Sequence, residues 1–135
     1  SIDNIDIFVY PTTLKNSGFF QITKFKILSY PRLISLNGKN TFKDLQFIIF
    51  QQFSKFLNQE DNININSIKL YFPHFSDSWQ SLKISNKKCP LCEKNYNNNT
   101  KGCELPYSQD SLISEIANHI RKLLNDDKRP IIIFF

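Results

Sequence analysis

The sequence predicts an α+β fold in which a mixed β-sheet is packed by one long helix and by a second, C-terminal helix. Apolar residues recur at helical spacing over residues 42–56, and short β-branched and aromatic runs lie before and after this stretch. Residues 131–135 form an unbroken apolar run, which is typical of a buried central strand. At 135 residues, 41% of them hydrophobic, the chain is long enough for one core and too short for two. We therefore expect residues 1–135 to form a single domain.

Three short strands are expected before the first helix. Residues 6–10 combine β-branched and aromatic side chains and stop at a proline, as strands often do. A connection through residues 16–18 leads to residues 19–28, which alternate in part between apolar and polar types. The candidates for inward positions there are Phe20, Ile22, Phe25 and Ile27. A third strand at residues 33–36 ends at the turn signal Asn37-Gly38.

The clearest helix is predicted over residues 42–56. Asn40 or Thr41 can cap its first turn, and Asp44 suits the positive end of the helix. The predicted inward face consists of Phe42, Leu45, Ile49, Phe53 and Phe56. We interpret this aromatic stripe as core and not as a ligand site.

The second half of the chain is predicted as a strand, a long connection, a helix and the final strand. Residues 68–72 alternate as a strand does and stop at Pro73. Residues 74–106 show little periodicity, and we expect them to form an inserted loop that is functional or tied down by a metal. A helix is expected from Ser108 or Ser111 onward. Its predicted apolar face consists of Leu112, Ile116, Ile120 and Leu123, with Ile113, Ala117 and Leu124 beside it.

All three cysteines of the chain lie in one polar stretch within this loop. Cys89 and Cys92 are separated by two residues, so both thiolates can reach one tetrahedral ion, and Cys103 can close on it after a connector. The expected metal is zinc, and its fourth ligand is not evident from the sequence. Thr100 stands where a closely spaced partner of Cys103 would be expected. His74 and His119 are the available histidines, although each alone reads as an ordinary half-buried side chain.

Two other interpretations of the cysteines stay open. Three free thiols in a reducing compartment need no function, or a metal site has decayed with the ligand at Thr100. Pairing Cys92 with His119 would suit nucleophilic catalysis, but a distant histidine does not activate a thiol unless the fold brings the two together. We expect no catalytic residues in this chain.

Composition narrows the classes of partner. The net charge is +5, but Lys and Arg occur in every segment beside Asp, Glu and Asn, so we expect a solvated surface and no nucleic-acid partner. Only three glycines are present, and no phosphate-binding loop is recognisable. No apolar run is long enough to cross a bilayer and no signal sequence is evident, so we expect no membrane partner.

The odd cysteine count favours the cytoplasm or nucleus. The abrupt start at Ser1 and the absence of Met suggest a piece of a longer protein.

The order of elements fits a roll that resembles the ubiquitin-like β-grasp, and several segments resemble the ubiquitin-specific protease family. The stretch KFKILSYPRLISLNGKNTFKDLQFIIFQQFSKFL (24–57) resembles the family pattern of a Tyr-Pro pair, a strand, and a helix that opens with Thr and an Asp-Leu pair. IDIFVY (5–10) resembles a strand leading into this unit. IKLYF (68–72) followed by CPLCEKNYNNNTKGCELP (89–106) is similar to the family's strand and CxxC…CxGC finger, with one cysteine replaced by Thr100.

The resemblance covers about half of the chain, in three pieces, and lacks the boxes that carry the family's nucleophilic cysteine and late histidine. It therefore implies a non-catalytic domain of a thiol protease that hydrolyses ubiquitin conjugates, with Cys89, Cys92 and Cys103 in its zinc finger. The partners it implies are ubiquitin, the catalytic domain of the parent protease, or other proteins in deubiquitination. The alternative is a free-standing ubiquitin-like protein-interaction module with a vestigial zinc finger.

Overall fold

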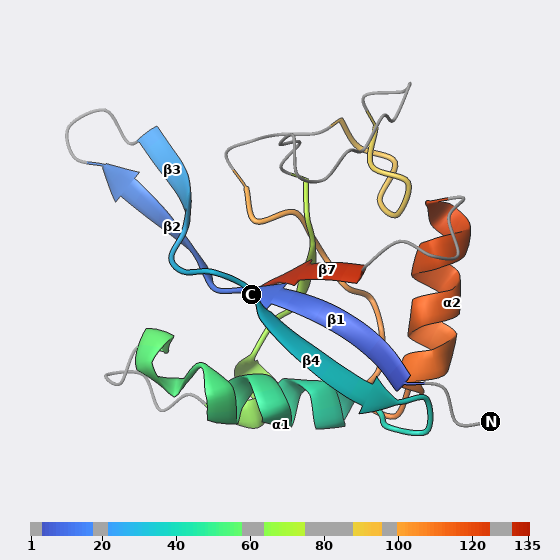
Figure 1. Cartoon of the computed structure of the whole chain (residues 1–135). Helices are drawn as coiled ribbons and strands as arrows, with labels where there is room; N and C mark the ends of the chain where they lie inside the picture. The colour runs from blue at the N-terminus through green and yellow to red at the C-terminus, as the bar shows by residue number, and fades with distance from the viewer. Residues whose placement is uncertain (1–3, 18–21, 58–63, 75–87, 96–99, 125–130) are drawn as a thin grey trace.

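A five-stranded mixed sheet forms the centre of the molecule. The computed structural model describes residues 4–17, 22–57, 64–74, 88–95, 100–124 and 131–135 (Figure 1). The strand order is β4 (Arg32–Asn37), β1 (Asn4–Tyr10), β7 (Ile131–Phe134), β5 (Tyr71–Phe72) and β6 (Cys103–Glu104). β1 runs antiparallel to β4 and parallel to β7, whereas β5 is antiparallel to both of its neighbours. The predicted α+β class with a mixed sheet is confirmed, and the C-terminal apolar run lies in the middle of the sheet.

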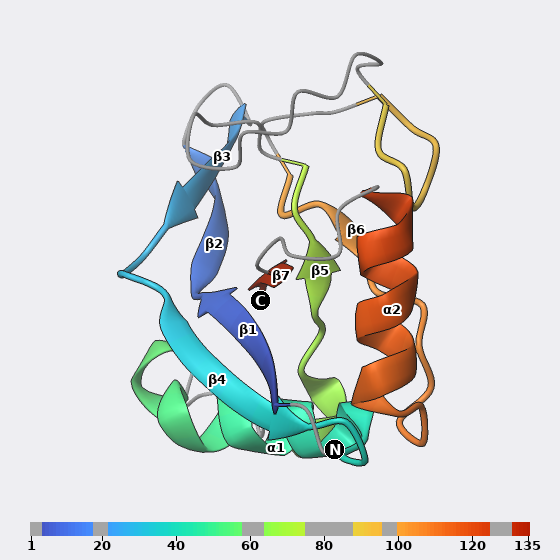
Figure 2. The same ribbon diagram turned by 45° about the vertical axis from the view of Figure 1, so that its right-hand side comes forward.

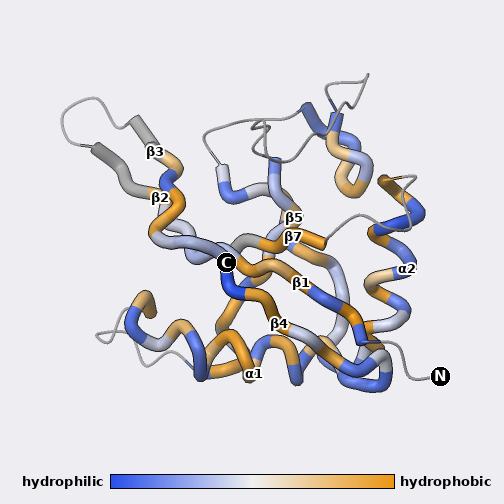
Figure 3. Tube along the Cα trace, viewed as in Figure 1, coloured by the Kyte–Doolittle hydropathy of each residue, from blue (hydrophilic) through white to orange (hydrophobic). Residues whose placement is uncertain are grey.

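Alternation along the strands directs one face of the sheet toward the helices. In β1, Ile5, Ile7 and Val9 are buried and the residues between them are more exposed. The register with β4 places Leu36 opposite Ile5 and Ile34 opposite Ile7, so the buried side chains of both strands lie on the same face. Apolar residues recur along β1 and β4 in the hydropathy view (Figure 3).

Helix α1 (Phe42–Gln52) begins at a capping box. The Thr41 side chain accepts the backbone N–H of Asp44, and the Asp44 carboxylate accepts the backbone N–H of Thr41. Phe42, Leu45 and Ile49 are buried as predicted. Phe53 is also fully buried but lies at the C-cap, and a 3₁₀ turn, η2 (Ser54–Phe56), follows it. The α-helix is therefore shorter than the predicted 42–56, and Phe56 is only half-buried.

Helix α2 (Ile113–Leu123) buries a face that differs from the predicted one at its start. Leu112, expected on the inward face, is the N-cap and is 37% exposed. The backbone pairs here with the chain ahead of α1, since Phe42 N–H donates to Ser111 O and Ile113 N–H donates to Asn40 O. This pairing delays the helix by one residue and turns Leu112 outward. The residues that are buried are Ile113, Ile116, Ala117 and Ile120.

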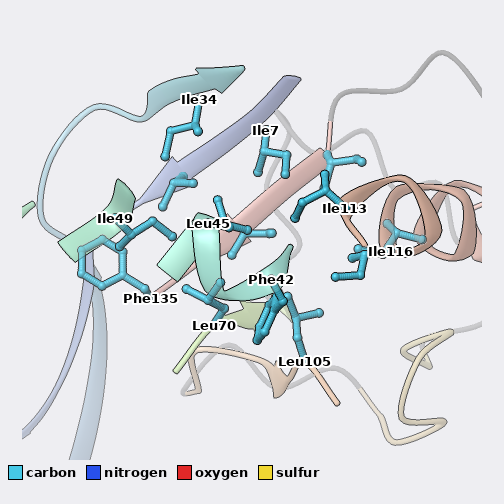
Figure 4. Packing of buried hydrophobic residues seen from close by; sticks show 14 of the residues in the cluster. Ile7, Ile34, Phe42, Leu45, Ile49, Leu70, Leu105, Ile113, Ile116 and Phe135 are labelled. Carbon is cyan, nitrogen blue, oxygen red and sulfur yellow. The ribbon is translucent and has the colours of Figure 1, made fainter. Parts of the chain in front are cut away.

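Side chains from both helices meet those of the sheet in one core. Figure 4 shows Leu45 and Ile49 of α1 and Ile113 of α2 gathered with Ile7 and Ile34 of the sheet. The alternating residues Ile68, Leu70 and Phe72 are all buried, but the strand predicted at residues 68–72 is limited to β5, residues 71–72. Gln46 is buried among them because its side-chain amide donates to the backbone oxygen of Ile68 at 2.8 Å.

A β-hairpin lies outside this sheet. β2 (Thr12–Ser17) and β3 (Ile22–Ile27) pair only with each other within the described residues, and the views show them projecting from the body (Figures 1 and 2). β3 lies within the strand predicted at residues 19–28, whereas β2 falls where a connection was expected. Phe25 and Ile27 are half-buried, and Phe20 lies outside the described residues.

The predicted inserted loop, residues 74–106, returns to the sheet at β6, which pairs with β5. That residues 74–106 are an insertion stays a prediction, and so does the resemblance of the fold to a β-grasp roll. Among the described residues, α1 and α2 are both too short to cross a bilayer.

Candidate metal centre

The turn that carries Cys89 and Cys92 is built by its own backbone. Cys89 N–H donates to Lys94 O and Glu93 N–H donates to Cys89 O, both at 2.8 Å. Glu93 has φ 62°, in the left-handed region that closes tight turns. Leu91 N–H points at Cys89 Sγ, 3.4 Å away. These bonds hold the two cysteines of the CPLC sequence on one small loop, as the spacing predicts.

Cys103 is positioned by the sheet. It lies in β6 opposite Phe72 of β5. The preceding Gly102 has φ +122°, and a Cβ at that position would lie 1.9 Å from the backbone oxygen of Phe72. Only glycine permits this close approach of the two strands. Thr100, at the position where a further cysteine was expected, accepts the N–H of Gly102 with its hydroxyl at 3.2 Å and so helps to form the turn before β6.

His74 completes a group of four. It follows β5 by two residues, is 6% exposed, and has its Nε2 3.4 Å from Cys92 Sγ. Cys89 Sγ and Cys103 Sγ are 3.7 Å apart. The four ligand atoms of His74, Cys89, Cys92 and Cys103 lie within 4.8 Å of one another, and this group could hold a metal ion.

These separations match a tetrahedral ion. With sulfur at about 2.3 Å and nitrogen at about 2.0 Å from zinc, tetrahedral geometry places two sulfurs roughly 3.8 Å apart and a sulfur and a nitrogen roughly 3.5 Å apart. The Cys89–Cys103 and Cys92–His74 separations, 3.7 Å and 3.4 Å, agree with these values. Three sulfurs and one imidazole nitrogen are a known ligand set for structural zinc. The residues present therefore fit the ion that the cysteine spacing predicts.

The thiols affect one another's ionisation. A hydrogen bond from the Cys103 thiol lowers the pKa of Cys89 to about 4, although burial acts to raise it. Hydrogen bonds from His74 and from the backbone of Cys92 and Leu91 lower this pKa as well. The same Cys89–Cys103 bond, burial, and the charges of Cys89 and Cys92 raise the pKa of Cys103. A divalent cation at this site would relieve the repulsion between thiolates that raises the pKa of Cys103.

His119, the other histidine considered as a ligand, lies elsewhere. Its Nδ1 is 2.6 Å from the hydroxyl of Tyr107, on the exposed side of α2. Tyr107 lies in the connection between β6 and α2, and its ring packs edge-on against Phe42 of α1, so this hydrogen bond ties His119 to that connection. The structure separates the two histidines because β5 ends beside β6, whereas residue 119 faces away from the core on its helix.

Comparison of this chain with protein-family models, with curated proteins and with solved structures finds no match. The candidate site is therefore supported by its own geometry.

Proposed function

We propose that His74, Cys89, Cys92 and Cys103 bind one structural zinc ion. The observation that carries this proposal is the convergence of four ligand atoms within 4.8 Å of one another, with two of their separations at tetrahedral values. Soft thiolates with one imidazole favour zinc over magnesium or calcium, which prefer oxygen ligands. Four protein ligands also close the coordination sphere, so no position remains for a substrate or an activated water.

The ion would act as an anchor. His74 follows β5 by two residues and Cys103 lies in β6, which pairs with β5, whereas Cys89 and Cys92 belong to a separate turn that lies between them in the sequence. A single ion would thus tie this turn to the sheet. Thiolates that bind zinc require a reducing environment, which supports the cytoplasm or the nucleus as the compartment.

Metal analysis tests this proposal. Purified protein should carry about one zinc per chain, and cobalt substitution should give the absorption spectrum of a tetrahedral thiolate site. Cys103→Ser and His74→Ala should each lower the metal content sharply. His119→Ala is the matched control, because His119 bonds to Tyr107 and should leave the content unchanged. Equal metal loss in the two histidine variants, or metal-free protein with an ordered loop, would contradict the assignment.

For the wider role, we propose a non-catalytic domain of a ubiquitin-specific protease that helps to position ubiquitin, a substrate or the catalytic domain. Support comes from the sequence resemblance and from the arrangement of the sheet, in which parallel first and last strands lie side by side and α1 packs against one face, as in a β-grasp roll. The alternative is a free-standing ubiquitin-like interaction module.

The enzymatic part of this proposal has a direct test. The domain alone should release no fluorophore from a fluorogenic ubiquitin conjugate, because its cysteines are proposed as metal ligands and not as nucleophiles. Binding to labelled ubiquitin or to a catalytic domain would support the positioning role. Fluorophore release that Cys92→Ser abolishes would overturn the non-catalytic assignment.

A further inference from the structure

Two cysteine sulfurs of the candidate metal centre lie close enough to react with each other. Cys89 Sγ, in the turn, is 3.7 Å from Cys103 Sγ, in β6, and both thiols are free in the structure. A disulfide joins two sulfurs at about 2.05 Å, so this pair needs to approach by roughly 1.7 Å. The third cysteine has a different contact, because Cys92 Sγ lies 3.4 Å from His74 Nε2.

The two thiols of this pair differ in exposure. Cys89 is 1% exposed and belongs to the buried core, whereas Cys103 is half-buried. A small oxidant dissolved in water therefore reaches Cys103 more readily than Cys89. Once Cys103 is oxidised, Cys89 is the neighbouring thiol that can resolve it to a disulfide.

We propose that hydrogen peroxide oxidises Cys103 and Cys89 to a disulfide that replaces zinc as the link between the turn and the sheet. This inference rests on the zinc site proposed above. The Cys103 thiolate attacks one peroxide oxygen, the O–O bond breaks, and a sulfenic acid and a hydroxide ion form. The Cys89 thiolate then attacks the Cys103 sulfur, the S–O bond breaks, and a second hydroxide ion leaves. The two thiolates lose two electrons to the peroxide, and two protons from the solvent convert the hydroxide ions to water.

The oxidation removes the metal but keeps the turn in place. Zinc loses two of its four ligands when the disulfide forms, so it leaves the site and releases His74 and Cys92. The new bond joins the turn at residues 88–95 to β6, which are elements that the ion also joins. The site therefore has two tethered states, one with zinc and one oxidised. Only the reduced, metal-free chain has a turn without a tether.

Peroxide treatment of the zinc-loaded native chain tests this inference. After removal of reductant, a stoichiometric amount of hydrogen peroxide should release about one zinc per chain to a chromogenic chelator. Free thiols should fall from three to one. Trypsin leaves Cys89 and Cys92 together on peptide 89–94 and places Cys103 on peptide 102–121. The disulfide should join these two peptides and leave Cys92 open to alkylation, and a reductant with added zinc should restore the metal-bound chain.

Cys92→Ser, in its reduced and metal-free form, is the matched variant. It keeps the proposed pair and removes the third thiol, so peroxide should still join the two peptides. A disulfide confined to peptide 89–94, joined peptides in which Cys89 is the alkylated residue, or sulfinic acid without any disulfide would each overturn the proposal.

Amide hydrogen exchange tests the tether itself. Residues 88–95 should stay protected in the oxidised, zinc-free chain and exchange faster in the reduced chain treated with a chelator. Equally fast exchange in the two forms would overturn the tether. A chain purified without zinc contradicts the metal site, and the peptide map of that reduced chain still tests the Cys89–Cys103 pair. A zinc-loaded chain that keeps its metal in peroxide contradicts this inference alone.

Discussion

Gly102 determines how closely Cys103 can approach His74. Its φ of +122° and the short distance from its position to Phe72 O mean that any side chain would push β6 away from β5. We predict that Gly102→Ala destabilises the protein by more than about 1 kcal/mol and weakens zinc binding as well. Chemical unfolding and a competitive zinc titration measure the two effects.

Gly38→Ala is the control for this substitution. A Cβ there would lie 3.2 Å from Ser114 Cβ, and the position does not have the left-handed backbone of Gly102. Gly38→Ala should therefore leave the zinc affinity unchanged. If Gly102→Ala bound zinc normally, β6 would not be the element that positions the site.

Phe53 tests the packing of the core at the end of α1. The Phe53 ring is fully buried. Its centroid lies 4.9 Å from the centroid of the Phe135 ring and 5.3 Å from the Arg32 guanidinium. Phe53→Ala should lower the free energy of unfolding by about 3–5 kcal/mol. Gln52→Ala, one residue earlier and exposed, should change it by no more than about 0.5 kcal/mol. Similar losses in thermal melting for the two variants would contradict the assignment of the buried face.

At the scale of the element, α1 followed its sequence signals because they are local. A Thr at the cap, an Asp three residues later and apolar residues at helical spacing all act within one or two turns. The start of α2 differs from the one that its sequence predicts, because the backbone of residues 111–113 forms hydrogen bonds with residues 40–42, which lie about seventy residues away in the sequence. Propensity alone cannot anticipate such a pairing.

The capping box of α1 should make its stability depend on pH. The backbone N–H of Thr41 and the side chain of Asn40 donate to the Asp44 carboxylate and hold the pKa of Asp44 below its ordinary value of 3.8. The stability that the ionised Asp44 carboxylate contributes is therefore fully present above pH 3.8, and it is lost as the pH falls through the lower pKa of Asp44 in the folded state. Asp44→Asn should be less stable than the native chain by about 0.3–1 kcal/mol at neutral pH.

Unfolding free energies measured across the acid range check this expectation. The difference between the native chain and Asp44→Asn should shrink at acid pH, where the native carboxyl is also neutral. A difference that stays constant down to the lowest pH would show that the charge on Asp44 does not contribute to the cap.

At the scale of the whole molecule, the core and the metal centre are distinct sources of stability. The sheet and both helices share one apolar core, whereas the turn at residues 88–95 has only Cys89 buried within that core. Removing zinc with a strong chelator should therefore speed amide hydrogen exchange at residues 88–95 and 100–104, and leave β1 and α1 protected. Unfolding of the entire chain on chelation would contradict this separation, and unchanged exchange would show that no ion holds the turn.

The sequence by itself determined the α+β class, the central position of the C-terminal strand, the capped first helix and the three cysteines of the candidate site. These follow from periodicity, turn chemistry and the CxxC spacing, which are all short-range properties. Only the tertiary structure decided that His74 joins the cysteines, that His119 does not, and that β2 and β3 stand outside the sheet. Each of these outcomes depends on which strands pair, and strand pairing joins residues that are far apart in the chain.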